Sequence, residues 1–308
     1  MNVLILGAGA VGLSITAKLS AVCNVHAVSR KRHADRIMSH GFRMSGMWGE
    51  GTYNFSCSED VPEDMDYDYI FITSKSTATE DICNQFSDVL RGREVISMQN
   101  GLGNEEIIEG YTDHVIGGTI ITGFEWKGDA QVNVSVESGP MNLGRFPGGL
   151  DSSVMKLADL INEAGIPVET TENIRSSIWS KVLYNSALNP LGAVMGVPYG
   201  KLDNVHAWAI IENIVKEAFI IAEVEKVELP WSMADEYLGY LHSVQLPNTR
   251  EHHSSMLQDI SSGRKTEIDF LNGEIARRAR KLGLAASYNT FISNQIHFME
   301  DLKDNGSK

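Results

Sequence analysis

The chain has 308 residues, 43% of them hydrophobic, and a formal net charge of -14. This length and apolar content suit two domains with buried cores. No apolar run reaches the roughly 20 residues of a membrane span, and the opening MNVLILGAGAVGL lacks the basic start and cleavage site of a signal peptide. We therefore expect a cytoplasmic protein without a membrane partner. The negative charge also argues against nucleic acid as a partner.

The three cysteines, Cys23, Cys57 and Cys83, are an odd number and form no C-x-x-C pair. No histidine stands near them at the spacing of metal ligands. We expect neither a disulfide framework nor a metal site.

Short β-rich runs alternate with amphipathic stretches in the first half of the chain. This alternation is typical of a parallel sheet covered by helices. The predicted strands lie near residues 2–7, 24–29, 68–73, 94–98 and 114–120.

Two further segments of the first half have no helical period. Residues 42–58 carry glycines and aromatic residues, which predicts an inserted antiparallel hairpin. Residues 119–145 alternate around the turn-like Lys-Gly-Asp at 127–129. This pattern predicts that the sheet ends in antiparallel strands.

After residue 171, long amphipathic runs punctuated by prolines replace the strand signals. They predict helices over about 172–194, 202–227, 231–243 and 254–283, with Gly263 dividing the last one. The predicted fold is thus an α/β domain over 1–170 followed by an all-α domain over 171–308.

A glycine-rich segment, LILGAGAVGLS, follows the first strand directly and opens a helix. It places Gly7, Gly9 and Gly12 in G-x-G-x-x-G register. The first glycine permits the tight turn, the second lets backbone N–H groups approach a pyrophosphate, and the third allows close packing of helix and strand. This Rossmann-type pattern predicts a dinucleotide site over Gly7, Ala8, Gly9, Ala10, Val11 and Gly12. The alternative is a glycine-rich turn without a ligand.

The end of the second strand indicates which dinucleotide binds. An NAD site usually presents Asp or Glu there to the ribose 2′-hydroxyl. This chain instead has Arg30, Lys31 and Arg32. A guanidinium matches phosphate oxygens in bidentate geometry, so we favour NADP(H), with Arg30 at the 2′-phosphate. The alternative, more plausible for Lys31 and Arg32, is a solvated basic start to the next helix.

Two other segments stand just past the ends of strands, where ligands bind in open α/β sheets. Lys75 lies in FITSKS and can reach the cofactor's phosphates or ribose. Asn100 lies in SMQNGLG and can hydrogen-bond near a nicotinamide. Because Asn-Gly is a common turn dipeptide, a simple turn is the alternative for Asn100.

The run IWSKVLYNSALNPLGAV carries Lys181, Asn185 and Asn189 four residues apart. On a helix these side chains form one narrow stripe. Pro190 frees the carbonyl of Ser186 and bends the helix where the stripe ends, which favours a binding cleft over an exposed stripe. In such a cleft the pKa of Lys181 falls toward the range of a proton donor.

Two residues of the last long segment are further candidates. Ser255 and Glu267 are either site residues or, more simply, a helix cap and a carboxylate at a helix start.

Over nearly its full length the sequence resembles the ketopantoate reductase family (2-dehydropantoate 2-reductases). The similar segments are GAGAVG at 7–12, QNGLG at 99–103, IWSKVLYNSALNPL at 178–191 and SSMLQDISSGRKTEIDFLNG at 254–273. The last two are specific to that family, whereas many unrelated enzymes share the glycine motif.

The resemblance implies NADPH-dependent reduction of ketopantoate to (R)-pantoate, on the route to pantothenate and coenzyme A. It implies a site in the cleft between the two domains. It also implies that Lys181 is the catalytic acid. The residues that would contact the substrate are Asn185, Asn189, Ser255, Asn100 and Glu267. Those that would contact the cofactor are Asn100, Lys75, Arg30 and Glu267.

The chain departs from the family pattern at Tyr199, where an asparagine often helps bind substrate, and at Ser287, where proline is common. Tyr199 changes one wall of the implied pocket, so another branched 2-keto acid is an alternative substrate. A non-catalytic NADP(H)-binding relative is a second alternative. Exposed apolar helix faces would support a homodimer.

Overall fold

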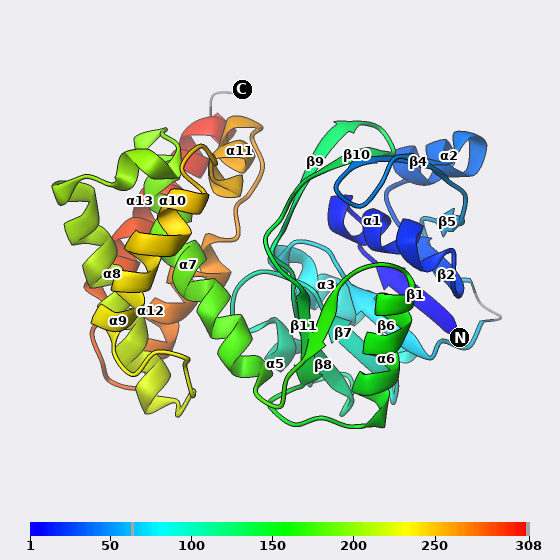
Figure 1. Ribbon diagram of the computed structural model, residues 1–308, viewed down its shortest axis with the longest axis horizontal. Coiled ribbons are helices and arrows are strands. Elements are labelled where there is room, and N and C mark those ends of the chain that lie inside the picture. Colours follow the sequence, from blue (N-terminus) through cyan, green and yellow to red (C-terminus); the bar gives the residue numbers. More distant parts are fainter. Residues whose placement is uncertain (63–64, 306–308) are drawn as a thin grey trace. The chain divides into compact units, whose positions relative to one another are not determined.

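The computed structural model describes residues 1–62 and 65–305. The chain divides into two compact units (Figure 1). The N-terminal unit comprises Met1–Gln99 and Asn104–Arg175, and the C-terminal unit comprises Asn100–Gly103 and the residues from Ser176 onward. The short loop Asn100–Gly103 therefore belongs with the helices and not with the sheet from which it emerges.

The N-terminal unit is built on an eight-stranded sheet of order β12-β11-β8-β7-β6-β1-β2-β5. All five predicted strands are confirmed within it, and β11 pairs antiparallel with β8 at one end. The strands are β1 (Asn2–Leu6), β2 (Asn24–Val28), β5 (Ser56–Ser58), β6 (Tyr69–Ile72), β7 (Glu94–Ser97), β8 (Val115–Thr119), β11 (Met141–Arg145) and β12 (Val168–Thr170). The order reverses between β1 and β6, the position where open α/β sheets bind ligands.

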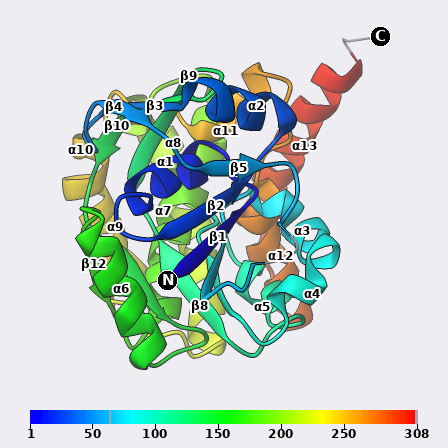
Figure 2. The same ribbon diagram turned by 90° about the vertical axis from the view of Figure 1, so that its right-hand side faces the viewer.

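The sheet separates two apolar cores because successive side chains of a strand point to opposite faces. In β1, Val3 and Ile5 enter one core, and Leu4 and Leu6 enter the other. The first core is covered by α1 (Ala10–Leu19), α2 (Lys31–His40) and α6 (Ser152–Glu163), and the second by α3 (Thr79–Gln85), α4 (Ser87–Leu90) and α5 (Asn104–Ile108). Figure 2 shows α1 and α6 on the opposite side of the sheet from α3, α4 and α5.

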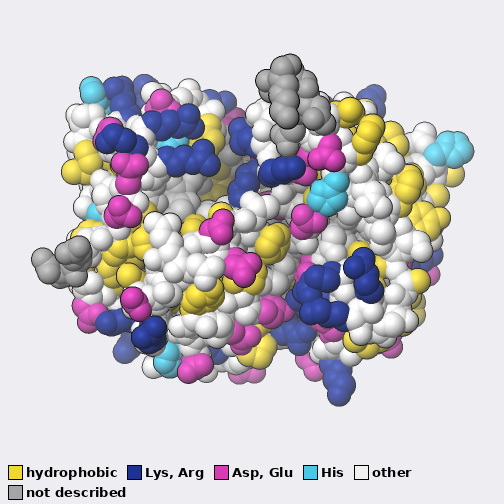
Figure 3. Space-filling view, turned by 180° about the vertical axis from the view of Figure 1, so that it is seen from behind, with side chains coloured by type: hydrophobic (Ala, Val, Ile, Leu, Met, Phe, Trp, Pro, Cys, Tyr) yellow, Lys and Arg dark blue, Asp and Glu magenta, His cyan; other side chains and the backbone are white. Residues whose placement is uncertain are grey.

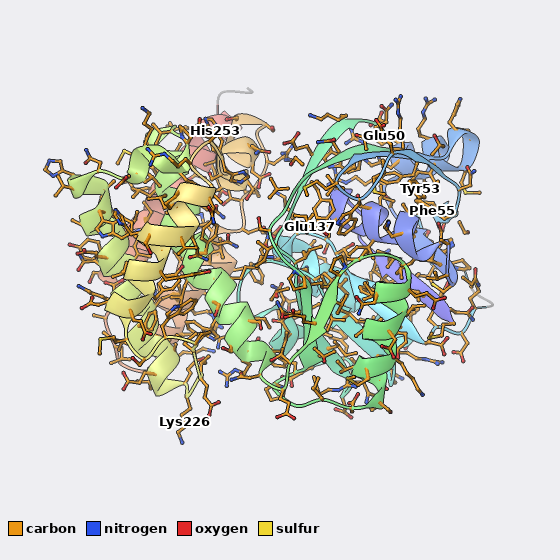
Figure 4. The ribbon with its side chains drawn as sticks, in the orientation of Figure 1. Glu50, Tyr53, Phe55, Glu137, Lys226 and His253 are labelled. Carbon is orange, nitrogen blue, oxygen red and sulfur yellow. The ribbon has the colours of Figure 1, made fainter. Side chains whose placement is uncertain are left out.

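A second sheet of order β4-β3-β10-β9 completes this unit. It contains the predicted hairpin of β3 (Phe42–Gly46) and β4 (Gly51–Tyr53), and the hairpin of β9 (Thr122–Gly128) and β10 (Gln131–Glu137). Residues 119–145 were expected to end the main sheet in antiparallel strands. This is confirmed for β11, which pairs antiparallel with β8, and wrong for β9 and β10. Strand β10 pairs with β3 instead, and its valines join the core beside Phe42. The Trp48 indole N–H donates to Glu137 at 3.0 Å, at the end of β10 (Figure 4).

The C-terminal unit is helical, so the predicted fold class is confirmed. Its main helices are α7 (Ile174–Met195), α8 (Val205–Val224), α9 (Ala234–Tyr240), α10 (Leu246–Asn248), α11 (Ser255–Ser261), α12 (Asn272–Lys281) and α13 (Ser287–Asn305). Gly263 does end a helix, with φ of +63° after α11. Helix α13 was not predicted.

Helix α7 contains Pro190, as the sequence indicated. The proline removes the N–H that would otherwise bond to the Ser186 carbonyl. That carbonyl accepts a hydrogen bond from Asn272 Nδ2 of α12 at 3.1 Å. A side-chain amide thus replaces the missing backbone donor.

Candidate active site

The glycine-rich loop joins β1 to α1 in the N-terminal unit. Gly7 has φ of +65°, and a Cβ there would lie 2.6 Å from that of Ser74. A Cβ at Gly12 would collide with the Thr73 hydroxyl, whereas at Gly9 the nearest atom would be 4.0 Å away. Gly7 therefore permits the turn and Gly12 the close packing, and the space beside Gly9, at the N-terminus of α1, is open.

The middle of this loop is held against the end of β2. Ala8 is buried; its N–H donates to the Val28 carbonyl at 2.8 Å, and its carbonyl accepts from the Ser29 hydroxyl at 2.7 Å. Ala10 and Val11, both partly buried, form the first turn of α1. Ser29 was not predicted as a site residue, although its position directly before Arg30 was a usable signal. Ser29 fixes the loop beside the residue expected to select the cofactor.

The basic residues after β2 differ in their surroundings. Lys31 lies 3.4 Å from Asp35 and 3.8 Å from Glu59, and Arg32 lies 3.6 Å from Asp129. Arg30 is exposed at the start of α2 and makes no ion pair with any residue in 1–62 or 65–305. Figure 3 shows Lys and Arg side chains gathered over the corner that carries α2. The structure thus supports an ordinary surface role for Lys31 and Arg32 and leaves Arg30 the candidate for phosphate.

Lys75 follows β6, the strand that pairs with β1, so its loop leaves the same edge of the sheet as the glycine loop. The side chain is partly buried at the start of the short helix Ser76–Ala78. A buried network that the sequence did not reveal supports this region. Gln99 Nε2 donates to the Thr79 hydroxyl at 2.6 Å, which donates to Asn104 Oδ1 at 2.8 Å.

The predicted polar stripe lies on α7 in the C-terminal unit. Lys181 is half-buried, whereas Asn185 and Asn189 are only 9% and 6% exposed. A fully solvated stripe is therefore excluded for the two asparagines. Burial of amide groups is unfavourable unless they are hydrogen-bonded, which makes their partners informative.

Asn189 has one partner among the described residues. The Tyr199 hydroxyl donates to Asn189 Oδ1. Tyr199 is 1% exposed and meets the Tyr184 ring edge-on at 6.0 Å. Burial, and secondarily the Tyr184 hydroxyl, raise the pKa of Tyr199 well above its ordinary value, so it stays a protonated donor. This contact was not foreseen from sequence.

Two other candidate residues, 167 positions apart, meet directly in the C-terminal unit. Asn100 Nδ2 donates to Glu267 Oε2 at 3.0 Å. Gly101, with φ of +92°, lies against the Phe270 carbonyl, which accepts the Leu102 N–H at 2.8 Å. The Asn100 and Glu267 side chains are both partly buried. Glu267 stands directly before the short helix Ile268–Phe270, at the helix start that the simpler interpretation expected, but its side chain accepts no capping hydrogen bond from that helix.

Ser255 was expected to be either a ligand or a cap. The cap is its neighbour: Ser254 Oγ accepts the Leu257 N–H at 2.9 Å and is fully buried. Ser255 is exposed in the first turn of α11. Figure 4 marks His253 on the segment that leads into this helix.

The three cysteines are free thiols. Burial raises the pKa of Cys57 and of Cys83 to about 12, with Glu80 adding to the effect at Cys83. Within 1–62 and 65–305, no three His, Cys, Asp or Glu side chains gather in a way that could hold a metal ion. In the same residues no helix has both the length and the apolar character that crossing a membrane requires.

The chain combines a largely parallel sheet, open backbone at Gly9, and a helical unit that carries a lysine and two buried amides. These features are typical of a nicotinamide-dependent oxidoreductase. Two family models match the chain: "Ketopantoate reductase PanE/ApbA" over residues 3–148 and "Ketopantoate reductase PanE/ApbA C terminal" over residues 173–300. The chain belongs to the ketopantoate reductase family, as the sequence predicted.

Individual relatives cover the whole chain. A 2-dehydropantoate 2-reductase of Pyrococcus horikoshii is 34% identical over 100% of both sequences. The solved structure of a PanE/ApbA family ketopantoate reductase from Ralstonia eutropha JMP134 has a TM-score of 0.88, with 28% identity over 99% of this chain and 100% of that one. D-mandelate dehydrogenase, solved with NADH and anilino(oxo)acetate, has a TM-score of 0.90, with 28% identity over 99% of each chain.

Proposed function

We propose that the protein reduces ketopantoate to (R)-pantoate with NADPH, in the route to pantothenate and coenzyme A. The observation that carries this proposal is the stripe on α7, where a half-buried lysine lies in line with two buried asparagines. The relatives named 2-dehydropantoate 2-reductase support the same reaction. The family alone does not choose between keto acids, so the reaction needs a direct test.

The residues at the glycine loop fit a dinucleotide, because the backbone at Gly9 is open and the N-terminus of α1 follows it. When bound, the nicotinamide supplies a hydride. Gly7 to Gly12 hold the pyrophosphate, Lys75 contacts phosphate or ribose, and Arg30 binds the 2′-phosphate. D-mandelate dehydrogenase, which has the same fold, was solved with NADH. The proposed preference for NADPH over NADH therefore rests on Arg30.

The C-terminal unit handles the keto acid. Lys181 donates a proton to the C2 oxygen as C2 is reduced, so that no free alkoxide accumulates. Asn185 and Asn189, with Ser255, hold the carboxylate and ketone oxygens through hydrogen bonds. Glu267, oriented by Asn100, contacts the substrate and the cofactor's ribose or nicotinamide.

A steady-state assay with ketopantoate and either NADPH or NADH tests substrate, reaction and cofactor together. We expect turnover with a higher kcat/KM for NADPH. Loss of NADPH absorbance should match the pantoate formed. Cofactor binding without turnover of any 2-keto acid would identify a non-catalytic relative.

A second candidate function is reduction of a different branched or bulkier 2-keto acid. Two observations favour it: Tyr199 replaces the asparagine common in the family, and the similarity to D-mandelate dehydrogenase extends over the whole chain. A panel of 2-keto acids decides the matter. A higher kcat/KM for an acid other than ketopantoate would replace the first assignment.

A further inference from the structure

Tyr199 is fixed in place from several sides. Its N–H donates to the His252 carbonyl at 3.0 Å, and its ring lies 5.3 Å from the His252 ring. The Tyr184 ring packs edge-on against it, and a Cβ added at Gly192 would lie only 3.4 Å from the Tyr199 ring. A side chain so enclosed holds its hydroxyl at one point, and that point is Asn189 Oδ1.

The direction of this hydrogen bond follows from the groups available. A carboxamide has one acceptor oxygen and an NH₂ group with two donors, and a neutral phenol has one proton to give. Tyr199 makes no other side-chain hydrogen bond with residues 1–62 and 65–305. If the amide were turned over, the buried phenol proton would have no acceptor, at a cost of about 1–3 kcal/mol. The oxygen of Asn189 therefore faces Tyr199.

The side of the amide that is turned away from Tyr199 carries the NH₂ group, which bonds to none of the residues in the described ranges. An amide with both kinds of group free can pair with a hydroxyl in both directions. An amide fixed with its NH₂ group outward can donate to an oxygen, but its own oxygen is turned away from a hydroxyl proton, so it pairs best with an oxygen that has only lone pairs, as in a carboxylate or a ketone.

We propose that Tyr199 determines substrate specificity by holding Asn189 with its NH₂ group toward the substrate, so that the amide donates to the oxygens of a branched 2-keto acid and does not accept the proton of a hydroxyl on its side chain. This inference rests on the proposed function as a 2-keto acid reductase. The substrate class is then wider than ketopantoate and includes acids whose branched side chain is wholly apolar.

A matched pair of substrates measures the effect. Ketopantoate and 3,3-dimethyl-2-oxobutanoate differ only by the side-chain hydroxyl. A site built to hydrogen-bond a hydroxyl rejects the analogue without it by about 10⁴-fold or more, whereas an apolar site discriminates by about 10²-fold or less. For the wild-type protein we expect the two kcat/KM values to agree within about tenfold.

The variant Tyr199→Phe frees Asn189 Oδ1 while keeping the ring. We expect the kcat/KM ratio to shift toward ketopantoate by at least about threefold, because the amide oxygen can then accept the substrate's hydroxyl proton. Tyr184→Phe is the matched control: it removes a neighbouring phenol that donates to Thr249 at 3.0 Å and not to Asn189. The control should keep the wild-type ratio.

The possible failures are distinct. If ketopantoate is reduced and the analogue is rejected by about 10³-fold or more, the inference is wrong and the proposed function stands. If Tyr199→Phe, folded and active, keeps the wild-type ratio, Tyr199 does not set the specificity. If neither acid is reduced, the proposed function itself fails, and the inference fails with it.

Discussion

Asn185 and Asn189 are unfavourable residues for a helix core. In the described part of the chain, Asn185 has no hydrogen-bond partner and Asn189 has only Tyr199. Neither amide is among the fully enclosed polar groups without a partner, so both keep some solvent contact and can bond to a ligand. The two amides are therefore the strongest structural indication that α7 faces a substrate.

Replacement of Lys181 tests the proton donor. We expect Lys181→Ala to lower kcat by about 10²–10⁴-fold while NADPH binding changes little, because a general acid acts on the reaction and not on the cofactor. The measurement is steady-state kinetics with titration of NADPH fluorescence. The control is Lys216→Ala, which removes an exposed lysine of α8 that lies 3.5 Å from Asp235 of α9. Full activity in Lys181→Ala would refute the role.

Replacement of Arg30 tests the proposed preference for NADPH over NADH. Arg30→Ala should weaken NADPH binding by about 10- to 100-fold more than NADH binding, since only NADPH carries the 2′-phosphate that a guanidinium binds. Arg36→Ala, on the same helix and also exposed, should change neither affinity. Equal losses for both cofactors would show that Arg30 does not contact the 2′-phosphate.

The sequence predicted which polar residues share a helix face but not which side chains contact one another. Four-residue spacing showed that Lys181, Asn185 and Asn189 share a face, and the family resemblance suggested their roles. The contacts of Asn189 with Tyr199 and of Asn100 with Glu267 were not predictable. They depend on side-chain rotamers and on the packing of distant segments, which no local pattern encodes.

At the scale of elements, a chain of buried amides surrounds the proline in α7. Asn272 donates to the Ser186 carbonyl and, at 3.0 Å, to Asn289 Oδ1. Asn289 in turn donates to Glu217 of α8 at 2.8 Å. Four helices are thereby linked by polar contacts at the point where the stripe of α7 ends.

This chain of amides can be tested by a double-mutant cycle. Asn272→Leu leaves the Ser186 carbonyl and Asn289 Oδ1 without a donor, and we expect a loss of about 2–3 kcal/mol in unfolding free energy. Adding Pro190→Ala restores an N–H to the Ser186 carbonyl and should recover about 1 kcal/mol. Chemical denaturation measures both. Strictly additive effects would show that Asn272 does not substitute for the missing backbone donor.

A charged side chain caps the start of α6. Asp151 caps this helix by accepting the N–H groups of Ser153 and Val154 at 2.9 and 3.0 Å, and Arg145 lies 2.7 Å away. Burial would raise the pKa of Asp151, but these hydrogen bonds and the Arg145 charge outweigh it and lower the pKa below its usual value. The stabilisation is therefore present above the unfolded pKa and lost as pH falls through the folded one.

We expect Asp151→Ala to destabilise the protein by about 1 kcal/mol at pH 7, and the difference to shrink as the pH falls below about 4. Denaturation at several pH values gives the comparison. Asp159→Ala removes the same charge from an exposed position later in α6 and should have little effect. A loss of equal size at pH 3 and pH 7 would argue against the ionised cap.

The elements show why strands were easier to predict than the last helix. Strand β1 is a continuous apolar run, so its burial is visible in the sequence. Helix α13 buries the polar residues Asn289, Ser293 and Glu300, while Phe291 and Phe298 are exposed. Hydrogen bonds rather than apolar contacts therefore hold part of the buried face of α13. As a result, its sequence lacks the apolar period by which a helix is predicted.

Cofactor binding should raise the unfolding free energy of the whole protein. Saturation at 100 times the dissociation constant adds about 2.7 kcal/mol to the unfolding free energy. We expect NADPH to raise Tm in the wild-type protein and in Lys181→Ala, and to raise it much less in Arg30→Ala at the same concentration. A thermal scan measures this. An unchanged Tm in the wild-type protein would contradict a nicotinamide site.

The homodimer expected from sequence stays a prediction. Exposed apolar side chains occur on α13, at Phe291, Phe298 and Leu302, and on α8, at Ile220 and Val224. Sedimentation equilibrium would measure the mass over a range of protein concentrations. A single monomer mass throughout would contradict the prediction.

The assignment of Asn100–Gly103 to the helical unit has a consequence for how the gene can be divided. The chain passes from one unit to the other three times, so the C-terminal unit is not encoded by one continuous stretch. A fragment starting at residue 176 would leave the Phe270 carbonyl without the Leu102 N–H and Glu267 without Asn100. A chimera that exchanges the C-terminal unit between relatives therefore needs to exchange Asn100–Gly103 with it, although in the sequence these four residues lie between the two segments of the N-terminal unit.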